Sequence, residues 1–248
     1  MAAARGTIAR RLAAISWAHR SRGLADPTKD GAVQLVAAGI RRTIGTAQEG
    51  RSPLVLADLR RLVAPLTGSL IDARDRALLL LGFAMAARRS ELVALDREHL
   101  VFDTSGLRVR IVRSKTDQEG VGEELGFPYG THPETCPVLA VDRWLDLAGI
   151  TTGPVFRSVN KAGRVQPGRL SDQVVALVVK KRATAAGIDA SRLSGHSLRR
   201  GLATTAALAG VPDRLIQGAG RWKSPAMVTR YTKSANVFAD SVSSKIGM

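Results

Sequence analysis

A histidine and an arginine on one predicted helix face carry the strongest chemical signal in this sequence. His196 and Arg199 stand three positions apart in the stretch His-Ser-Leu-Arg-Arg, so a helix places both side chains on the same side. Gly195 comes just before them and leaves room for the close approach of a ligand. The N-terminus of a helix favours an anion at that point. The pattern therefore predicts a site for a negatively charged group.

Four other short stretches carry polar side chains that a helical scaffold does not need. In Ala-Arg-Arg-Ser-Glu-Leu, Glu91 lies within reach of Arg88 as a neutralising or orienting partner. Ser-Lys-Thr places Lys115 at the tip of a predicted hairpin. Gly-Arg-Trp contains Trp222, and Arg-Tyr ends at Tyr231 nine positions later. Taken singly, these stretches have ordinary alternatives: a surface ion pair, a solvent-exposed lysine and a tyrosine that only packs.

Taken together and in this order, the five stretches resemble the tyrosine recombinase (phage integrase) family. Their order, their separations and the step from Trp222 to Tyr231 all agree with the family pattern, over roughly residues 53–231. The resemblance implies a catalytic set, with Glu91 in support, that consists of Arg88, Lys115, His196, Arg199, Trp222 and the nucleophile Tyr231.

The resemblance implies phosphoryl transfer between DNA strands. Tyr231 attacks a phosphodiester and forms a covalent 3′-phosphotyrosyl intermediate, which the 5′ hydroxyl of a second DNA end then attacks. Arg88 and Arg199 are permanently charged forks suited to clamp the non-bridging oxygens. A tyrosine hydroxyl needs help to lose its proton at neutral pH, for which His196 is the expected base or phosphate ligand. The departing 5′ oxygen needs a proton, and Lys115 is the expected general acid.

Trp222 is expected to donate its indole N–H to a phosphate oxygen, at a position where the family more often has histidine. Arg89 takes a place that is commonly apolar, and Arg88 remains the expected clamp residue. Because two arginines supply the positive charge, the chemistry needs no metal and no other cofactor. The other histidines stand at unrelated positions and Cys136 is the only cysteine, so no metal site is predicted.

The charge balance predicts a polyanionic partner. The chain has 37 Lys and Arg against 21 Asp and Glu, a net charge of +16. Residues 157–200 hold ten basic residues against two acidic ones, which is half of that excess. Such a charge favours nucleic acid first and an acidic membrane surface second, with a solvated basic face as the plain alternative. We expect double-stranded DNA as the partner and a homo-tetramer on DNA, with a monomer or dimer when free.

The sequence shows no sign of export or membrane insertion. A single cysteine forms no intrachain disulfide and favours a reducing compartment. The first residues lack the apolar core of a secretory signal. The longest apolar run, residues 77–87, is too short to span a bilayer and is typical of a buried helix. We therefore expect a soluble, cytoplasmic protein without a membrane partner.

The elements that must position these residues are mostly helical. Residues 107–111 alternate between apolar and basic side chains, which predicts a strand with one basic face, followed by a turn at 116–122 and a second strand near 124–127. Helical periodicity covers 57–66, 72–87, 138–148, 170–186, 196–209, 213–219 and 226–232. The predicted fold is mainly α with one small antiparallel β-sheet (α+β), as in the catalytic domain that the resemblance implies.

A polar, glycine-containing stretch at residues 45–53 is the best linker in the chain. Two helical patterns precede it, with Pro27 at the start of the second. The resemblance implies a partial helical core-binding (SAM-like) DNA-binding domain over 1–48 and a catalytic domain over 53–248. A complete core-binding domain has more helical content, so the chain is either a shortened protein or a fragment.

Two other functions remain open, because related folds serve them. One is a non-recombining relic or regulator that binds DNA with a truncated clamp. The other is a type IB topoisomerase, which relaxes supercoils by the same chemistry. The tail at 232–248 shows helical spacing of apolar residues, and we expect it to dock on a neighbouring protomer or on its own chain.

Overall fold

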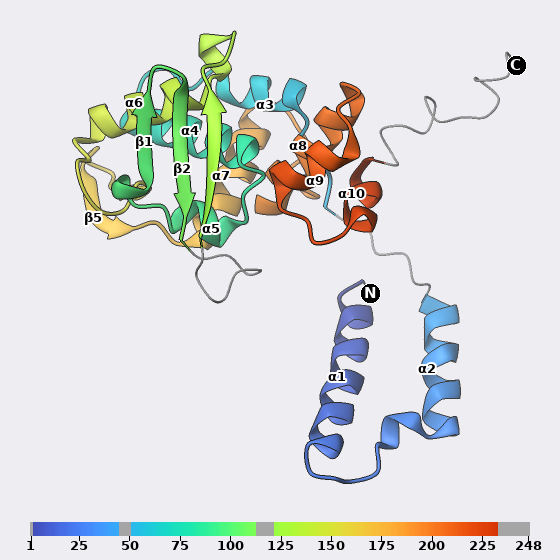
Figure 1. Cartoon of the computed structure of the whole chain (residues 1–248). Helices are drawn as coiled ribbons and strands as arrows, with labels where there is room; N and C mark the ends of the chain where they lie inside the picture. The colour runs from blue at the N-terminus through green and yellow to red at the C-terminus, as the bar shows by residue number, and fades with distance from the viewer. Residues whose placement is uncertain (1, 45–50, 113–121, 233–248) are drawn as a thin grey trace, which may run out of the picture. The chain divides into compact units, whose positions relative to one another are not determined.

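The computed structural model describes residues 2–44, 51–112 and 122–232, and it divides the chain into two compact units, 1–50 and 51–248 (Figure 1). The first unit contains helices α1 (Ala2–Arg20) and α2 (Gly31–Ile44), with a 3-10 turn, η1 (Pro27–Lys29), between them. The Asp26 carboxylate accepts hydrogen bonds from the Ser16 hydroxyl at 2.6 Å and the Thr28 N–H at 3.0 Å. Pro27 therefore begins this turn, and the prediction that it begins the second helix is wrong.

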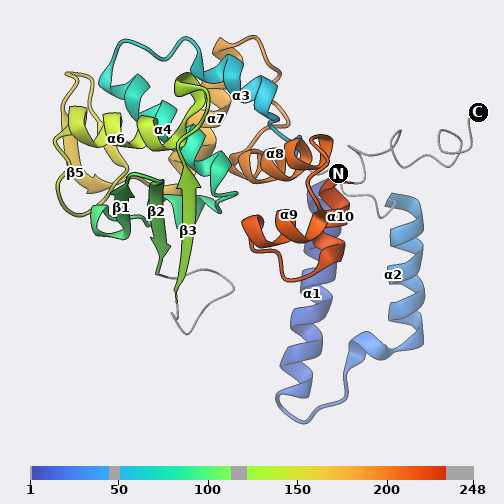
Figure 2. The ribbon, with the colours of Figure 1, turned by 45° about the horizontal axis from the view of Figure 1, so that its top comes forward.

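The second unit is mainly helical and carries two small antiparallel sheets (Figure 2). The expected fold class is confirmed, but the prediction of one sheet is wrong. Its helices are α3 (Leu56–Val63), α4 (Leu70–Ala84), α5 (Arg89–Val93), α6 (Pro137–Ala148), α7 (Asp172–Ala185), α8 (Gly195–Leu208), α9 (Asp213–Gly220) and α10 (Pro225–Thr232), with 3-10 turns η2 (Arg97–His99) and η3 (Pro133–Thr135). Strands β1 (Leu100–Asp103), β2 (Gly106–Ile111) and β3 (Glu123–Pro128) form the first sheet, and β4 (Arg157–Val159) and β5 (Val165–Arg169) form the second.

Helix α4 lies at the centre of the main core. The Ser69 hydroxyl accepts the Asp72 N–H at 3.1 Å, and the Asp72 carboxylate accepts the Ser69 N–H at 3.2 Å, so the first turn is capped in both directions. The helix is apolar on nearly every side and packs against α6 and α8. On α6, the fully buried Trp144 donates its indole N–H to the Val155 carbonyl at 2.8 Å. The described helices include none that is long and apolar enough to cross a membrane.

A buried ion cluster joins α4 to α7. Asp75 is 1% exposed and accepts hydrogen bonds from Arg74 at 2.7 Å and from Arg182 of α7 at 2.6 Å. Arg182 also pairs with Asp72 at 2.9 Å. A buried carboxylate is tolerated only when it is paired in this way. The cluster therefore fixes α7 against the central helix.

The hairpin stem of the first sheet follows the predicted alternation. Val109 and Ile111 of β2 are buried, while Arg108 and Arg110 are exposed on the opposite face. Strand β3 pairs with β2 in antiparallel register, with Glu123 opposite Ile111. Residues 113–121, which include most of the predicted turn, lie outside the described residues.

The first residues of the second unit lie along α8. The Ser52 N–H donates to the Arg192 carbonyl, and the Leu54 N–H donates to the Ser197 carbonyl, both at 3.0 Å. A β-carbon at Gly201 would stand 1.8 Å from the Leu54 carbonyl oxygen, so only glycine fits there. This entry segment, residues 52–56, is thus docked directly on the helix that carries the His-Ser-Leu-Arg stretch.

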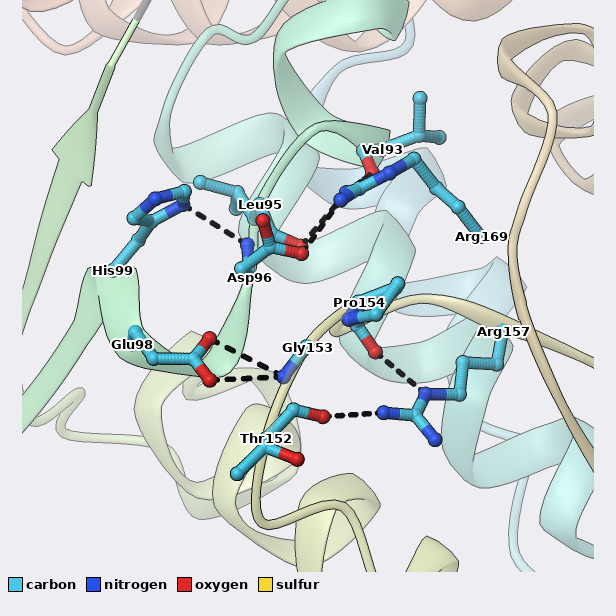
Figure 3. Close-up of polar contacts among 10 residues, drawn as sticks. All are labelled: Val93, Leu95, Asp96, Glu98, His99, Thr152, Gly153, Pro154, Arg157 and Arg169. Carbon is cyan, nitrogen blue, oxygen red and sulfur yellow. Dashed lines mark hydrogen bonds and ion pairs between the residues drawn. The ribbon is translucent and has the colours of Figure 1, made fainter.

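The second sheet holds the C-terminal end of α5 (Figure 3). Arg169 of β5 donates to the carbonyls of Val93 at 2.7 Å and Leu95 at 3.3 Å, and it pairs with Asp96 at 2.6 Å. The Val93 carbonyl belongs to the last turn of the helix, where a cation is favoured, and Leu95 follows just after the helix ends. The short helix is therefore anchored at the end opposite to Arg88.

A second, smaller core lies between α8, α9 and α10, which are neighbours in both views (Figures 1 and 2). Three of its members are alanines, so little apolar area is buried in it compared with the main core. Its buried members are Ala86, Ala203, Ala207, Ile216, Trp222 and Val228.

Candidate active site

Arg88 caps the short helix α5. The sequence predicted it at the end of the apolar helix, but α4 ends at Ala84 and the chain reverses at Ala86, whose φ is +44°. The Arg88 N–H donates to Glu91 Oε2 at 3.0 Å, and its Nη1 donates to Glu91 Oε1. Glu91 is 3% exposed. The structure therefore places Glu91 in contact with Arg88, where it can orient the guanidinium group.

A second arginine binds the same carboxylate. Arg221 Nη2 donates to Glu91 Oε2 at 2.7 Å, and its Nη1 donates to the Met85 carbonyl at 3.3 Å. Burial alone would raise the pKa of Glu91, but the hydrogen bonds from Arg88 and the nearby charges of Arg221 and Arg88 outweigh it and lower that pKa. No role for Arg221 was predicted from the sequence, because its partner stands 130 positions earlier.

Helix α8 begins with a polar cap. The Ser194 hydroxyl accepts the His196 N–H at 3.2 Å, and the Ser194 N–H donates to the Ser197 hydroxyl at 3.0 Å. A β-carbon at Gly195 would stand 2.3 Å from Arg89 Cγ. The space that the sequence assigned to a ligand beside Gly195 is therefore filled by the stem of Arg89.

Arg199 is buried one turn further along α8. It is 5% exposed, its Nη1 donates to the Ala86 carbonyl, and its guanidinium carbon lies 4.4 Å from the centre of the Trp222 ring. Burial and then the charges of Arg88 and Arg221 lower the pKa of Arg199 to about 10. The group stays charged at neutral pH, and it stands in a field of like charges that an anion would relieve.

The aromatic rings of Trp222 and Tyr231 lie against each other near the C-terminal end of the described residues. A β-carbon at Gly220 would stand 1.7 Å from the Trp222 ring, so this glycine makes the room in which the ring lies. The Trp222 and Tyr231 rings are 5.6 Å apart at an angle of 47°. Trp222 Nε1 is buried and has no hydrogen-bond partner within the described parts of the chain. A buried donor left unpaired in this way is costly unless a ligand accepts from it.

His196 lies at the rim of this cluster. Partial desolvation is the first cause that lowers the pKa of its imidazole, and the charges of Arg199, Arg89 and Arg88 follow. The residue is exposed, so solvent reaches the ring. The lowered pKa keeps the ring neutral at pH 7, which is the form that can accept a proton.

Helices α5, α8 and α10 and the turn after α9 bring the predicted residues together. Lys115 lies outside the described residues, so its position stays a prediction. Across residues 2–44, 51–112 and 122–232, no three His, Cys, Asp or Glu side chains form a group that could hold a metal ion. The residues that the structure gathers are Arg88, Glu91, His196, Arg199, Trp222 and Tyr231, joined by the unforeseen Arg221.

The buried Arg199 and the partly buried Arg88 thus lie in one cluster with an unpaired indole donor and a tyrosine ring. The model of the phage integrase family matches residues 54–237, so the chain belongs to the phage integrase family. The resemblance drawn from the sequence motifs is confirmed.

Similar proteins carry recombinase names. An integrase/recombinase XerD homolog from Selenomonas ruminantium is 43% identical over 239 residues, which cover 94% of this chain and 70% of the relative. The tyrosine recombinase XerD of Neisseria meningitidis (strain Z2491) is 30% identical over 74% of this chain and 58% of its own. The crystal structure of XerH site-specific recombinase with its difH substrate aligns with a TM-score of 0.57 and 16% identity, over 77% of this chain and 54% of that one. The chain thus spans little more than half the length of two of these relatives.

Proposed function

We propose that this chain is a site-specific DNA recombinase or integrase that cleaves and rejoins DNA through Tyr231. The observation that carries the proposal is the convergence of Arg88 and Arg199 on one site with the unpaired indole N–H of Trp222 and the ring of Tyr231. Family membership and the recombinase names of the relatives support it.

The charge of the site supports a phosphate ligand. Arg88 and Arg221 pair with a single buried carboxylate, Glu91, and Arg199 lies near enough to be affected by all three charges, so positive charge is in excess. Arg88 donates one guanidinium nitrogen to Glu91, and its side chain is 18% exposed. Its other N–H groups therefore remain available to a ligand. A phosphodiester oxygen would supply the missing negative charge and accept these donors.

The proposed reaction breaks one bond to phosphorus as another forms. The Tyr231 hydroxyl oxygen attacks the phosphorus, its proton passes to the neutral His196, and the P–O5′ bond breaks with a proton from Lys115. The 5′ hydroxyl of a second DNA end then attacks the phosphotyrosine and passes its proton to Lys115, while His196 returns its proton to the leaving Tyr231 oxygen. Arg88 and Arg199 hold the non-bridging oxygens while charge builds on them.

Double-stranded DNA is the proposed partner, in a homo-tetramer on DNA that is a monomer or dimer when free. The net charge of +16 supports a polyanionic partner, and the XerH relative is described bound to its own DNA substrate. We further propose that residues 1–48 form part of a core-binding DNA-binding domain and that 53–248 form the catalytic domain. Action on DNA also implies a cytoplasmic location.

Covalent capture tests the proposal. The chain is incubated with a library of genomic DNA duplexes nicked near the cleavage point, which traps the intermediate, and attached fragments are sequenced. Wild type should form a covalent complex through Tyr231, and Tyr231→Phe should form none while binding DNA with an unchanged salt dependence. A chelator should leave trapping unchanged.

The alternatives give different results in the same experiments. DNA binding without any trapped complex would favour the non-recombining relic. Relaxation of supercoiled plasmid without strand exchange between two sites would favour a type IB topoisomerase. Loss of trapping with the chelator would contradict the metal-free mechanism.

A further inference from the structure

The side chain of Arg221 is almost fully buried and has three polar neighbours. Its side chain is 5% exposed, binds Glu91 Oε2 at 2.7 Å and the Met85 carbonyl at 3.3 Å, and lies 3.7 Å from Glu123 of β3. Its Nε is buried and finds no hydrogen-bond partner in the described part of the chain. Burying a cation in this way costs desolvation free energy, which its contacts or its function must offset.

The backbone at Arg221 is unfavourable as well. Its φ of +55° lies in the left-handed region, which a residue with a β-carbon seldom adopts. Ala86, at φ +44°, shares this property, and the Arg221 side chain donates to Met85, the residue just before it. Strained non-glycine residues tend to cluster where function requires them. These two residues lie beside Arg88 and Arg199.

We propose that Arg221 is a positioning residue of the reaction, which acts on the scissile phosphate through Glu91 and Arg88. This inference rests on the proposed function. Glu91 Oε2 accepts from Arg221 and from the backbone N–H of Arg88, so the Arg88 guanidinium contacts the carboxylate through Nη1 alone. Without Arg221, one lone pair of that oxygen opens to a second guanidinium nitrogen of Arg88, in the bidentate geometry that arginine and carboxylate prefer. Arg88 would then turn away from the phosphate.

The contact with Glu123 contributes less to this role. Glu123 is half exposed and the pair is long at 3.7 Å, so solvent screens it. The contact with Glu91 is short and almost fully buried, and it therefore dominates. The effect of Arg221 should accordingly depend on Arg88 and on the charge of the phosphate, and only weakly on Glu123.

Arg221→Gly is the informative variant, because glycine adopts φ +55° without strain and the backbone is preserved. The rate of covalent complex formation at saturating DNA should fall about 10- to 100-fold, since a small displacement of a clamp residue has an effect of that order. DNA affinity should stay close to that of wild type. Arg221→Lys should recover part of the rate, because it returns a charge to Glu91 without the contact to Met85.

A substrate with a methylphosphonate at the scissile position separates positioning from folding. One non-bridging oxygen is replaced by a methyl group, which removes the charge that Arg88 meets. The rate ratio of wild type to Arg221→Gly should therefore shrink on this substrate. An equal ratio on both substrates would show that Arg221 only supports the fold and would overturn the inference, as would a wild-type rate for Arg221→Gly.

Arg182→Met supplies the matched control, because Arg182 also pairs with a buried carboxylate but lies outside the site. It should lower the melting temperature and leave the cleavage rate unchanged well below that temperature. An equal slowing by Arg182→Met would trace the effect to lost stability and refute the inference. If the wild-type chain forms no covalent complex, the proposed function fails first, and that result is recognisable from the wild type alone.

Discussion

The unpaired indole N–H of Trp222 provides the sharpest test of the site. Trp222→Phe removes this donor and keeps an aromatic ring in the space beside Gly220. A hydrogen bond to a charged group contributes about 1.5–3 kcal/mol, which corresponds to about 10- to 150-fold in rate. We expect covalent complex formation to slow by that factor at saturating DNA.

The stability of Trp222→Phe should change little. The substitution leaves a small cavity that costs about 1–2 kcal/mol, and it removes a buried, unpaired donor whose desolvation costs about 1–3 kcal/mol. The two effects oppose each other. Thermal unfolding of the variant should therefore start near the wild-type temperature, with the loss confined to the reaction rate.

Trp144→Phe is the matched control with the opposite outcome. Trp144 is also buried, but its N–H already donates to the Val155 carbonyl at 2.8 Å. The variant loses this bond and leaves a cavity, at about 2–4 kcal/mol, or a melting temperature lower by about 4–16 °C. Its cleavage rate should match wild type. The reasoning fails if Trp222→Phe cleaves at the wild-type rate, or if both variants lose rate in proportion to their stability.

Two further predictions concern the surroundings of the ring and the proposed base. Gly220→Ala should displace Trp222 and reduce cleavage about 100-fold, whereas Gly218→Ala in the same helix, with nothing within 4 Å, should not; single-turnover trapping compares them, and equal rates would contradict the packing argument. Because the pKa of His196 lies below 6.5, the ring stays neutral to lower pH, and cleavage at subsaturating DNA should decline only below that value. His196→Gln should abolish this acid limb, and a midpoint above 6.5 would count against His196 as the base.

The longer helices could be predicted from the sequence because their apolar periodicity persists for several turns. Helices α6 and α8 begin and end within one residue of the prediction. The short strands β1, β4 and β5 escaped prediction, since three to five residues hold too little alternation to signal a strand. The separate helix α5 was missed because the apolar run continues through Ala87, past the end of α4 at Ala84.

The order of the site residues was visible in the sequence, but their support was not. Arg221 was not predicted because its contact with Glu91 depends on a left-handed turn after α9. Such a turn usually has glycine or asparagine at the left-handed position, and this one has neither. Gly195 was assigned to a ligand, whereas Arg89 fills its space. Both depend on tertiary contacts across more than a hundred residues, which local patterns do not encode.

The docking of residues 52–56 on α8 has a mechanical consequence. The Leu54 N–H donates to the carbonyl of Ser197, which stands between His196 and Arg199 on the same helical turn. Because Gly201 has no side chain, the same segment approaches the helix more closely than a β-carbon would allow. A displacement of residues 52–56 would therefore be felt directly by the helical turn that carries His196 and Arg199.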